Sequence, residues 1–267
     1  MNNILFFLIK LPIIKRLIPS LIKNLSKIFN LKVKVIRNKA LFLLNLKNQH
    51  DRAILLSPEY EPEQINFFMK QIKSKNDFSI FIDIGACIGF YSLSIAKLCS
   101  DISKIIIFEP NLDNFSCLKK NVELNKDIYE KTQLYNTGLS NKNDKIKLFT
   151  LKSNDGAGGS IPEYEGQYDN KKGAVSFNVD IKVGDEILKY KNEKIALKID
   201  VERHEINVLK GIKDLLTNNK CLIQIEIFDE YLNDVNKIMK DYKFVQFFKV
   251  HHKYEVNLSD YYFKNYW

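Results

Sequence analysis

Residues 78–90 contain glycines and an aspartate at spacings that suit cofactor binding. An apolar strand over residues 78–84 includes Asp83 and runs into a turn with Gly85 and Gly89, after which an apolar helix begins. Glycine at such a turn lets a ligand approach the backbone closely, because it has no Cβ. The start of the helix adds free backbone N–H groups. This layout is typical of a site for a nucleotide-type cofactor.

The spacing of the turn distinguishes between two cofactor classes. A dinucleotide-binding turn has the pattern G-x-G-x-x-G, but residues 85–89 read GACIG and lack the middle glycine. A second apolar strand, residues 105–108, ends on Glu109-Pro110-Asn111. An acid there can accept hydrogen bonds from both hydroxyls of a ribose. A solvated strand-end charge is the alternative for Glu109, but the order strand, turn, helix, strand and acid favours the ribose role. The pattern D-x-G-x-x-x-G resembles the first motif of Rossmann-like S-adenosylmethionine methyltransferases.

A second chemical cluster lies at another strand-to-helix turn and comprises Lys198, Asp200, Glu202, His204 and Glu205. The cluster brings three carboxylates, a lysine and a histidine together within eight residues. Placing so many charged groups close together costs free energy, which favours a function for at least some of them. Part of the cluster has a structural explanation. Glu205 suits the first turn of a helix, and Lys198 and Asp200 share one face of a regular strand and can pair. For Asp200 and Glu202 we favour a functional role.

Alternating strands and helices position both clusters. The predicted strands are residues 78–84, 104–108, 129–137, 146–151, 174–181, 195–200, 221–228, 244–250 and 254–258, and the predicted helices are residues 63–72, 88–99, 111–125, 184–190, 205–216 and 233–242. This order indicates an α/β protein with a Rossmann-like, doubly wound, mostly parallel seven-stranded sheet and an antiparallel edge hairpin. Ligands of such sheets bind at the carboxyl ends of the strands. The acids at or near such ends are Asp83, Glu109, Asp200 and Glu226.

The basic charge is concentrated at the N-terminus. The first 50 residues carry ten Lys and Arg and no Asp or Glu, so the rest of the chain is nearly neutral despite the net charge of +9. We take residues 1–50 as a basic amphipathic extension, a helix and then a hairpin of residues 31–36 and 40–46, and residues 51–267 as the main domain. Apolar residues of the helix recur at helical spacing with lysines opposite. Such a helix suits peripheral contact with a membrane through residues 1–30. The alternative is packing on the domain or on a second subunit.

The sequence also limits the cellular location. The apolar run at residues 4–9 is too short to span a membrane, which takes roughly 20 apolar residues, and it lacks the start and cleavage site of a signal peptide. The four cysteines include no C-x-x-C pair and look like reduced, small apolar residues. We therefore expect a cytoplasmic protein, peripheral on the inner face of the membrane if the helix binds lipid. The histidines have no zinc-ligand spacing, so no structural metal is expected.

Four blocks of the sequence, in order, resemble those of the FkbM-type methyltransferase family: FIDIGACIGFYS, FEPNLDNFSCLKKNVELN, LKIDVERHEINVLKG and IQIEIF. The resemblance covers roughly residues 78–228. It implies a Rossmann-like fold, S-adenosylmethionine as cofactor, and methylation of a hydroxyl, often on a sugar of a polysaccharide or glycosylated metabolite. The residue roles it implies are contact with the methionine end by Asp83, Gly85 and Gly89, ribose binding by Glu109 with Asn111 beside it, and contact with cofactor and substrate by Asp200 and Glu202.

Two positions depart from the family pattern. Cys87 stands where the family usually has Asn, which removes a polar contact beside the cofactor turn. Arg203 stands where it usually has Gly, and this long cation either clashes or recruits an anionic acceptor such as a uronic acid or a phosphorylated sugar. The departures leave open a different class of function, a catalytically degenerate module that binds cofactor or a partner at the membrane surface.

Methyl transfer to a sugar hydroxyl requires alignment of the nucleophile and a base that removes its proton. His204 has the most suitable intrinsic pKa for that base, whereas Asp200 or Glu202 needs burial to raise its pKa. The family resemblance favours the carboxylates, and Lys198 completes the candidate catalytic set. Alternatively, Asp200, Glu202 and Glu226 bind a divalent ion that lowers the pKa of the hydroxyl. A nucleic-acid acceptor is not expected, because the domain lacks a basic stripe for phosphates.

Two segments are candidates for acceptor binding. Residues 152–173 concentrate Gly, Ser, Asp and Asn, and a loop of this length in a compact domain is usually a lid or disordered. We favour a substrate-side lid. The C-terminal aromatic residues can stack on sugar rings or pack a homodimer, and we favour packing. They are Tyr254, Tyr261, Tyr262, Phe263, Tyr266 and Trp267.

Overall fold

The computed structural model describes residues 14–57, 59–75, 77–151, 174–252 and 256–266. The predicted lid at residues 152–173 and the apolar run at residues 4–9 lie outside the described residues. Among the helices that are described, none has the length and apolar character needed to span a bilayer.

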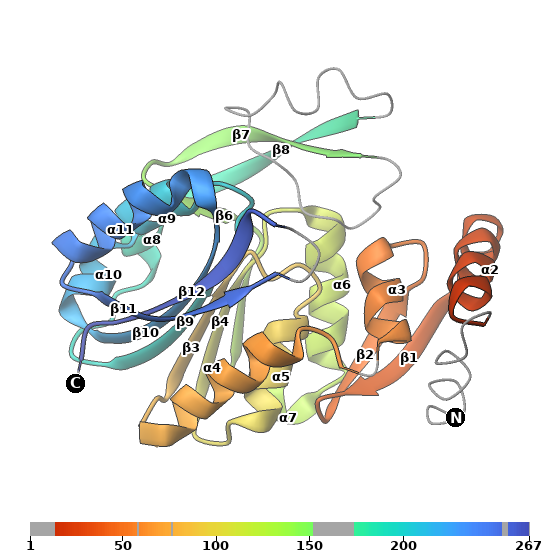
Figure 1. Ribbon diagram of the computed structural model, residues 1–267, viewed down its shortest axis with the longest axis horizontal. Coiled ribbons are helices and arrows are strands. Elements are labelled where there is room, and N and C mark those ends of the chain that lie inside the picture. The colour runs from red at the N-terminus through yellow and green to blue at the C-terminus, as the bar shows by residue number, and fades with distance from the viewer. Residues whose placement is uncertain (1–13, 58, 76, 152–173, 253–255, 267) are drawn as a thin grey trace.

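A seven-stranded sheet forms the centre of the molecule, in the order β11-β12-β10-β9-β3-β4-β5 (Figure 1). In chain order these strands are β3 (Ile80–Ile84), β4 (Lys104–Phe108), β5 (Thr132–Tyr135), β9 (Lys194–Ile199), β10 (Lys220–Phe228), β11 (Val245–His251) and β12 (Leu258–Lys264). The strands from β10 to β5 pair in parallel, whereas β12 is antiparallel to both β10 and β11. The predicted fold class is confirmed. The strand order reverses between β3 and β9, which is where ligands of such sheets bind.

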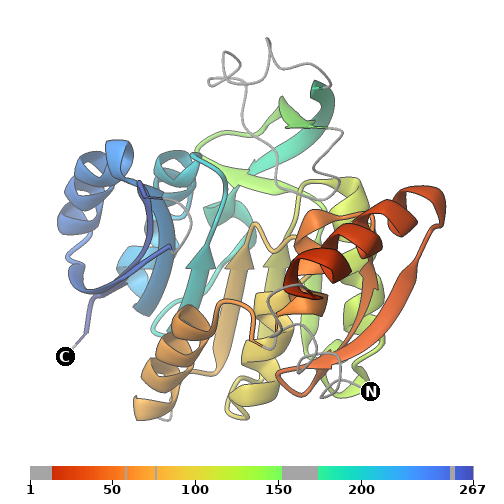
Figure 2. The same ribbon diagram turned by 45° about the vertical axis from the view of Figure 1, so that its right-hand side comes forward.

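Helices cover both faces of this sheet (Figure 2). One face carries α4 (Pro62–Lys75), α5 (Phe90–Leu98), α6 (Leu112–Glu123) and α7 (Lys126–Tyr129), and the other carries α8 (Gly184–Ile187), α9 (Glu205–Gly211), α10 (Lys213–Asn218) and α11 (Leu232–Asp241), with the short 3₁₀ helix η3 (Asp229–Tyr231) ahead of α11. Because both faces are covered, β3 is buried at every position. Such strands give continuous apolar runs in a sequence, which is why β3, β4 and β9 could be predicted.

The edge of the sheet differs from the prediction. The second strand of the predicted hairpin covers later residues than expected, because it is β12, which begins at Leu258 and pairs between β10 and β11, whereas residues 254 and 255 of the predicted strand lie outside the described residues. The segment includes Ser259 and Asp260, which interrupt its apolar pattern but are 1% and 2% exposed. Their burial depends on partners from neighbouring strands.

A smaller sheet lies beyond the carboxyl ends of the central strands, with the order β6-β8-β7. Its strands are β6 (Gly138–Ser140), β7 (Asp144–Leu151) and β8 (Ala174–Val183). The antiparallel β7–β8 pair projects from the body (Figures 1 and 2). The two strands flank residues 152–173, as predicted.

The N-terminal segment contains α2 (Ile14–Ile28), the antiparallel pair β1 (Lys32–Arg37) and β2 (Ala40–Asn45), and α3 (Gln49–Leu56). The predicted helix and hairpin are confirmed, and α3 was not predicted. Phe42 is fully buried and its ring lies 5.2 Å from that of Phe90. The backbone N–H of Leu43 donates to Asn121 Oδ1 at 2.8 Å. The hairpin therefore shares the core of the main domain, while α2 lies at the outer edge (Figure 1).

Candidate functional site

Polar side chains form two rows on the sheet face that α4 and α5 cover. Residues in register on neighbouring strands point to the same face. Asp83, Lys198 and Gln224 are in register and make the first row. Asp200 and Glu226 lie two residues further along the chain from Lys198 and Gln224, and they make the second row together with Asp260 of β12, which is directly opposite Glu226. Both rows end at the point where the strand order reverses.

The turn after β3 passes close to the end of β9. Gly85 has a φ of 87°, and a Cβ built on it would lie 1.8 Å from the carbonyl oxygen of Asp200. Gly89, with a φ of 82°, is the N-cap residue of α5. Cys87 has a φ of 52°, a conformation that Asn adopts more readily than Cys. The backbone itself therefore requires glycine at residue 85, and the family preference for Asn at residue 87 has a conformational explanation.

Glu109 follows β4, and its carboxylate points back to this turn. Oε2 accepts a hydrogen bond from the backbone N–H of Cys87 at 2.7 Å, and Oε1 accepts one from that of Asn111 at 2.8 Å. Burial raises the pKa of Glu109 to about 7, although these N–H groups act in the opposite direction. A carboxylate has about four acceptor sites, and these two N–H groups and the Asn114 side chain occupy three of them, so Glu109 can still accept a hydrogen bond from a ribose. The Asn111 side chain caps α6 by accepting from the N–H groups of Asp113 and Asn114.

Lys198 is the buried cation of the first row, and its side chain reaches the second row. Its Nζ lies 2.6 Å from Asp200 Oδ2 and 5.1 Å from the centroid of the Tyr91 ring. Burial acts to lower the pKa of Lys198, but the attraction of four carboxylates outweighs burial and raises the pKa. These carboxylates are Asp200, Asp83, Glu61 and Glu226. The pairing of Lys198 with Asp200 that the strand geometry predicted is present.

Asp83 is fully buried at the end of β3. Its Oδ2 accepts a hydrogen bond from Ser92 Oγ at 2.5 Å, whereas Oδ1 has no hydrogen-bond partner among the described residues. Burial raises the pKa of Asp83, against the opposing effects of Lys198 and Ser92. An unpartnered carboxylate oxygen beside the glycine turn suits a ligand with a cationic amino group.

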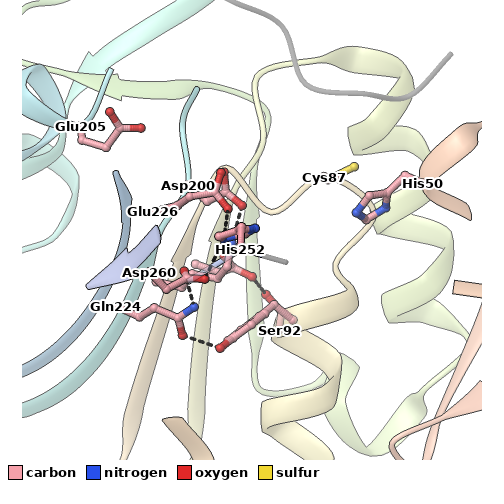
Figure 3. Close-up of polar contacts among 12 residues, drawn as sticks. His50, Cys87, Ser92, Asp200, Glu205, Gln224, Glu226, His252 and Asp260 are labelled. Atoms are coloured by element: carbon pink, nitrogen blue, oxygen red, sulfur yellow. Dashed lines mark hydrogen bonds and ion pairs between the residues drawn. The ribbon is translucent and has the colours of Figure 1, made fainter. Parts of the chain in front are cut away.

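The second row continues into a hydrogen-bond network (Figure 3). His252 Nε2 lies 2.9 Å from Asp260 Oδ2 and 3.1 Å from Glu226 Oε2. Gln224 Nε2 donates to Asp260 Oδ1 at 2.7 Å, and the Tyr91 hydroxyl donates to Gln224 Oε1. Burial acts to lower the pKa of His252, but hydrogen bonds to the two carboxylates raise it to about 11. His252 and Asp260 were not predicted as site residues.

The segment before α4 contributes further residues that the sequence did not reveal. His50 Nε2 lies 2.6 Å from the Tyr60 hydroxyl, and burial lowers the pKa of His50 to about 4. The charges of Asp200 and Lys198 also act on His50, which lies across from Asp200 in Figure 3. Burial raises the pKa of Glu61 to about 7. These residues belong to α3 and the turn after it, where no local motif marks them.

His204 and Glu205 of the KIDVERHE cluster lie away from the rows. His204 is buried, with Nε2 2.9 Å from Ser140 Oγ and Nδ1 3.0 Å from Asn207 Nδ2. Burial lowers the pKa of His204 to about 4. Because both ring nitrogens already have partners in the protein, this geometry does not favour His204 as the general base. Glu205 Oε1 accepts from the N–H of Arg203 at the start of α9, and Figure 3 shows Glu205 apart from Asp200.

Glu202 and Arg203 form a turn with positive φ values of 51° and 76°. The family preference for Gly at residue 203 suits such a backbone. The guanidinium of Arg203 lies 4.2 Å from the centroid of the Phe228 ring and 3.6 Å from Glu230 Oε1. Arg203 also lines a cavity of about 320 Å³ with Asp229 and other residues of the strand ends. The arginine therefore packs on neighbouring side chains at the rim of the site.

A doubly wound sheet whose order reverses beside a glycine turn, with an acid after the next strand, is a Rossmann-like arrangement that suits a nucleotide-type cofactor. The family model described as "Methyltransferase FkbM domain" matches residues 83–245, more than half of the chain. The chain belongs to the FkbM methyltransferase family. It is a methyltransferase, and S-adenosylmethionine is its cofactor.

Solved structures with a similar fold include several methyltransferases. Methyltransferase FkbM from Methylobacillus flagellatus KT has a TM-score of 0.50 and 17% identity, over 94% of this chain and 59% of that one. Precorrin-6y C5,15-methyltransferase from Geobacter metallireducens GS-15 has a TM-score of 0.44 and 11% identity, over 76% of this chain and 87% of that one. TYW2 from M. jannaschii, solved in complex with AdoMet, has a TM-score of 0.47 and 10% identity, over 87% of this chain and 84% of that one. No curated protein matches the chain.

Proposed function

We propose that this protein transfers a methyl group from S-adenosylmethionine to a hydroxyl of a sugar, in a surface polysaccharide or a glycan precursor. The observation that carries the proposal is the convergence of the Gly85 turn, Glu109 and Asp200 at the point where the strand order reverses. Glu109 would accept from the ribose hydroxyls, and Asp83 with the turn would hold the amino-acid end. When bound, the cofactor supplies the activated methyl group.

The residues of the second row would hold the acceptor. Asp200 is partly exposed, with 29% of its side chain accessible, and Lys198 holds one of its oxygens. The Asp200 carboxylate can therefore accept a hydrogen bond from the acceptor hydroxyl and orient it toward the methyl group, which is the main requirement of an in-line transfer. Glu202, in the adjoining turn, is the second acceptor-side carboxylate of this proposal.

Replacement of Asp200 tests the acceptor side. We expect Asp200→Asn to lower methyl transfer by about 100-fold or more, because positioned acid–base groups contribute on that order. Mass spectrometry of surface glycans from cells with the wild-type chain, the variant, or neither would show a methylated sugar in the first case only. Asp241→Asn, at an exposed position, is the matched control. Identical glycans in all the cells would contradict a sugar acceptor.

Replacement of Glu109 tests the cofactor side. The amide of Glu109→Gln cannot accept from both backbone N–H groups, and it loses the charged hydrogen bonds to the ribose, which are worth about 1.5–3 kcal/mol. We expect S-adenosylhomocysteine to bind about 100-fold more weakly in calorimetry. Glu123→Gln, on the exposed side of α6, should bind as the wild type does. Equal affinity of the two variants would remove Glu109 from the cofactor site.

We further propose that α2 holds the protein at an anionic membrane surface. Leu17, Leu21 and Ile28 are 61%, 58% and 74% exposed, and Lys23 and Lys32 are exposed nearby. An amphipathic helix of this kind can bury its apolar side chains in the interface while the lysines contact anionic lipids. The exposure of these side chains supports a contact outside the domain, and packing on a second subunit is the alternative to the membrane surface.

Flotation with vesicles that contain phosphatidylglycerol tests the membrane contact. We expect the triple variant Leu17→Ser, Leu21→Ser and Ile28→Ser to bind the vesicles at least about 10-fold more weakly than the wild type. Each apolar side chain buried in the membrane interface contributes on the order of 1.5 kcal/mol or more. Val245→Ser, at an exposed apolar position on β11, is the control. Wild-type protein that stays unbound at low salt would exclude the contact.

A further inference from the structure

A partly buried acid and a buried acid face each other across the antiparallel pair β10–β12. Glu226 and Asp260 are in direct register, and their side chains are 18% and 4% exposed. Like charges directly opposite each other destabilise a sheet, and burial makes the repulsion more costly. Such an arrangement calls for a cation between the two carboxylates.

His252 lies at that point. Its Nε2 is 2.9 Å from Asp260 Oδ2 and 3.1 Å from Glu226 Oε2, so the three ligand atoms converge from β12, β10 and the residue after β11. All three lie within 4.8 Å of one another. Atoms bound to one ion at about 2.0–2.2 Å can lie up to about 4.4 Å apart, so the two distances to His252 Nε2 already fit a shared ion, and the two carboxylate oxygens need at most a few tenths of an ångström of adjustment. Among the described residues, no other group of three or more His, Cys, Asp and Glu side chains brings its ligand atoms this close together.

The carboxylate of Asp260 is also held from behind. Gln224 Nε2 donates to its second oxygen at 2.7 Å, and Gln224 is in turn held by the hydroxyl of Tyr91. Hydrogen-bonded partners of this kind fix the orientation of metal ligands in known sites. This orientation leaves Asp260 Oδ2 directed at His252 Nε2. The hydrogen bonds of Gln224 and Tyr91 hold the Asp260 carboxylate in place on the side away from His252.

We propose that Glu226, His252 and Asp260 bind a divalent first-row transition-metal ion. An imidazole with two carboxylates suits Mn²⁺, Fe²⁺ or Zn²⁺ better than the all-oxygen sets that Mg²⁺ and Ca²⁺ prefer. The ion would replace the proton on Nε2 as the cation between the acids. These ligands differ from the set Asp200, Glu202 and Glu226 that the sequence suggested. Asp200 is paired with Lys198 instead.

The site adjoins the acceptor side, because Glu226 and Asp200 directly follow the paired residues Ile225 and Ile199 of β10 and β9. An ion there would act as a Lewis acid that lowers the pKa of the acceptor hydroxyl, and this role rests on the proposed function. Binding of the ion does not depend on it. A metal-binding experiment can therefore fail or succeed independently of whether the acceptor is a sugar.

The test uses the full-length protein after treatment with a chelator, at pH 7.5. Mn²⁺ is titrated with the signal of free Mn²⁺ followed by electron paramagnetic resonance, and Zn²⁺ by equilibrium dialysis. We expect one ion per chain in the wild type, and affinity weaker by about 100-fold in His252→Gln and Glu226→Gln. His251→Gln, at the exposed neighbouring position, should keep the wild-type affinity.

Circular dichroism melts establish that each variant is folded. Glu226→Gln keeps the side-chain shape at a partly exposed position, so it remains informative if His252→Gln does not fold. Wild-type protein that binds neither Mn²⁺ nor Zn²⁺ in stoichiometric amount would overturn the proposal. So would binding that the His252 and Glu226 variants retain, because the ion would then lie elsewhere.

Discussion

Lys198→Met is expected to destabilise the protein by about 3–5 kcal/mol at pH 7.5, because removal of one partner of a buried ion pair leaves an uncompensated charge. Lys198 is 6% exposed, and its Nζ contacts Asp200. Asp83 and Glu61 also lose the cation that attracts them. For a chain of this size the loss corresponds to a decrease in Tm of roughly 10 °C, measurable by differential scanning calorimetry.

The loss should become smaller at lower pH. Glu61 has a pKa that burial raises to about 7, and Lys198 is the first of the groups that oppose this shift. Without the lysine, the pKa of Glu61 in the folded state rises further above its unfolded value. A carboxyl group with a raised folded-state pKa destabilises the fold above the unfolded pKa, and this cost declines as pH falls from the folded value toward the unfolded one. Denaturant melts at pH 5.5 should therefore show a smaller difference from the wild type than melts at pH 7.5.

Lys97→Met is the matched control. Lys97 Nζ lies 2.7 Å from Asp127 Oδ1, but 65% of the Asp127 side chain is exposed. Exposed pairs of this kind contribute at most about 1 kcal/mol, so the control should lose little stability at either pH. A Lys198→Met protein as stable as the Lys97→Met protein would show that the lysine does not compensate the buried acids.

The elements that carry the cofactor site could be predicted because their signals are local. β3 and β4 are apolar at nearly every position, and the glycine turn and Glu109 follow them directly in the sequence. The close approach of the Asp200 backbone also requires glycine at residue 85. The sequence does not show this contact, but the glycine that it requires is part of the turn motif that the sequence does show. The cofactor half of the site is thus encoded in short segments.

The acceptor half depends on tertiary contacts and was predicted less well. Asp260 interrupts an apolar segment, so β12 was placed too early in the chain. The burial of Asp260 is explained by its hydrogen bonds with Gln224 on β10 and with His252, which follows β11. His204 was favoured by its intrinsic pKa, but the start of α9 directs it toward Ser140. His50 enters the site through α3, a helix without a distinctive pattern. Residues that meet through strand pairing leave no periodic signal in the sequence.

Gly85→Ala is expected to have the other large effect. The backbone at Gly85 has a φ of 87°, which costs an L-residue about 1–2 kcal/mol, and the new Cβ would lie 1.8 Å from the carbonyl oxygen of Asp200. The obstacle is backbone, so β3 and β9 must separate where the N–H of Asp200 donates to Ile84 at 3.0 Å. We expect a loss of about 3 kcal/mol or more in the free energy of unfolding, and no detectable binding of S-adenosylhomocysteine in calorimetry.

Gly89→Ala separates the clash from the backbone strain. Gly89 has nearly the same φ, 82°, but its Cβ would meet the Cδ1 atom of Leu118 at 2.5 Å. That atom is the end of a side chain, which can rotate away, so the variant should lose only about 1–2 kcal/mol from the conformational cost. The difference between the two variants measures how strongly the crevice depends on the contact between the β3 turn and Asp200. Equal losses in stability would mean that the Asp200 backbone moves away from a new Cβ as easily as the Leu118 side chain does. The close approach of the two strand ends would then not determine the shape of the site.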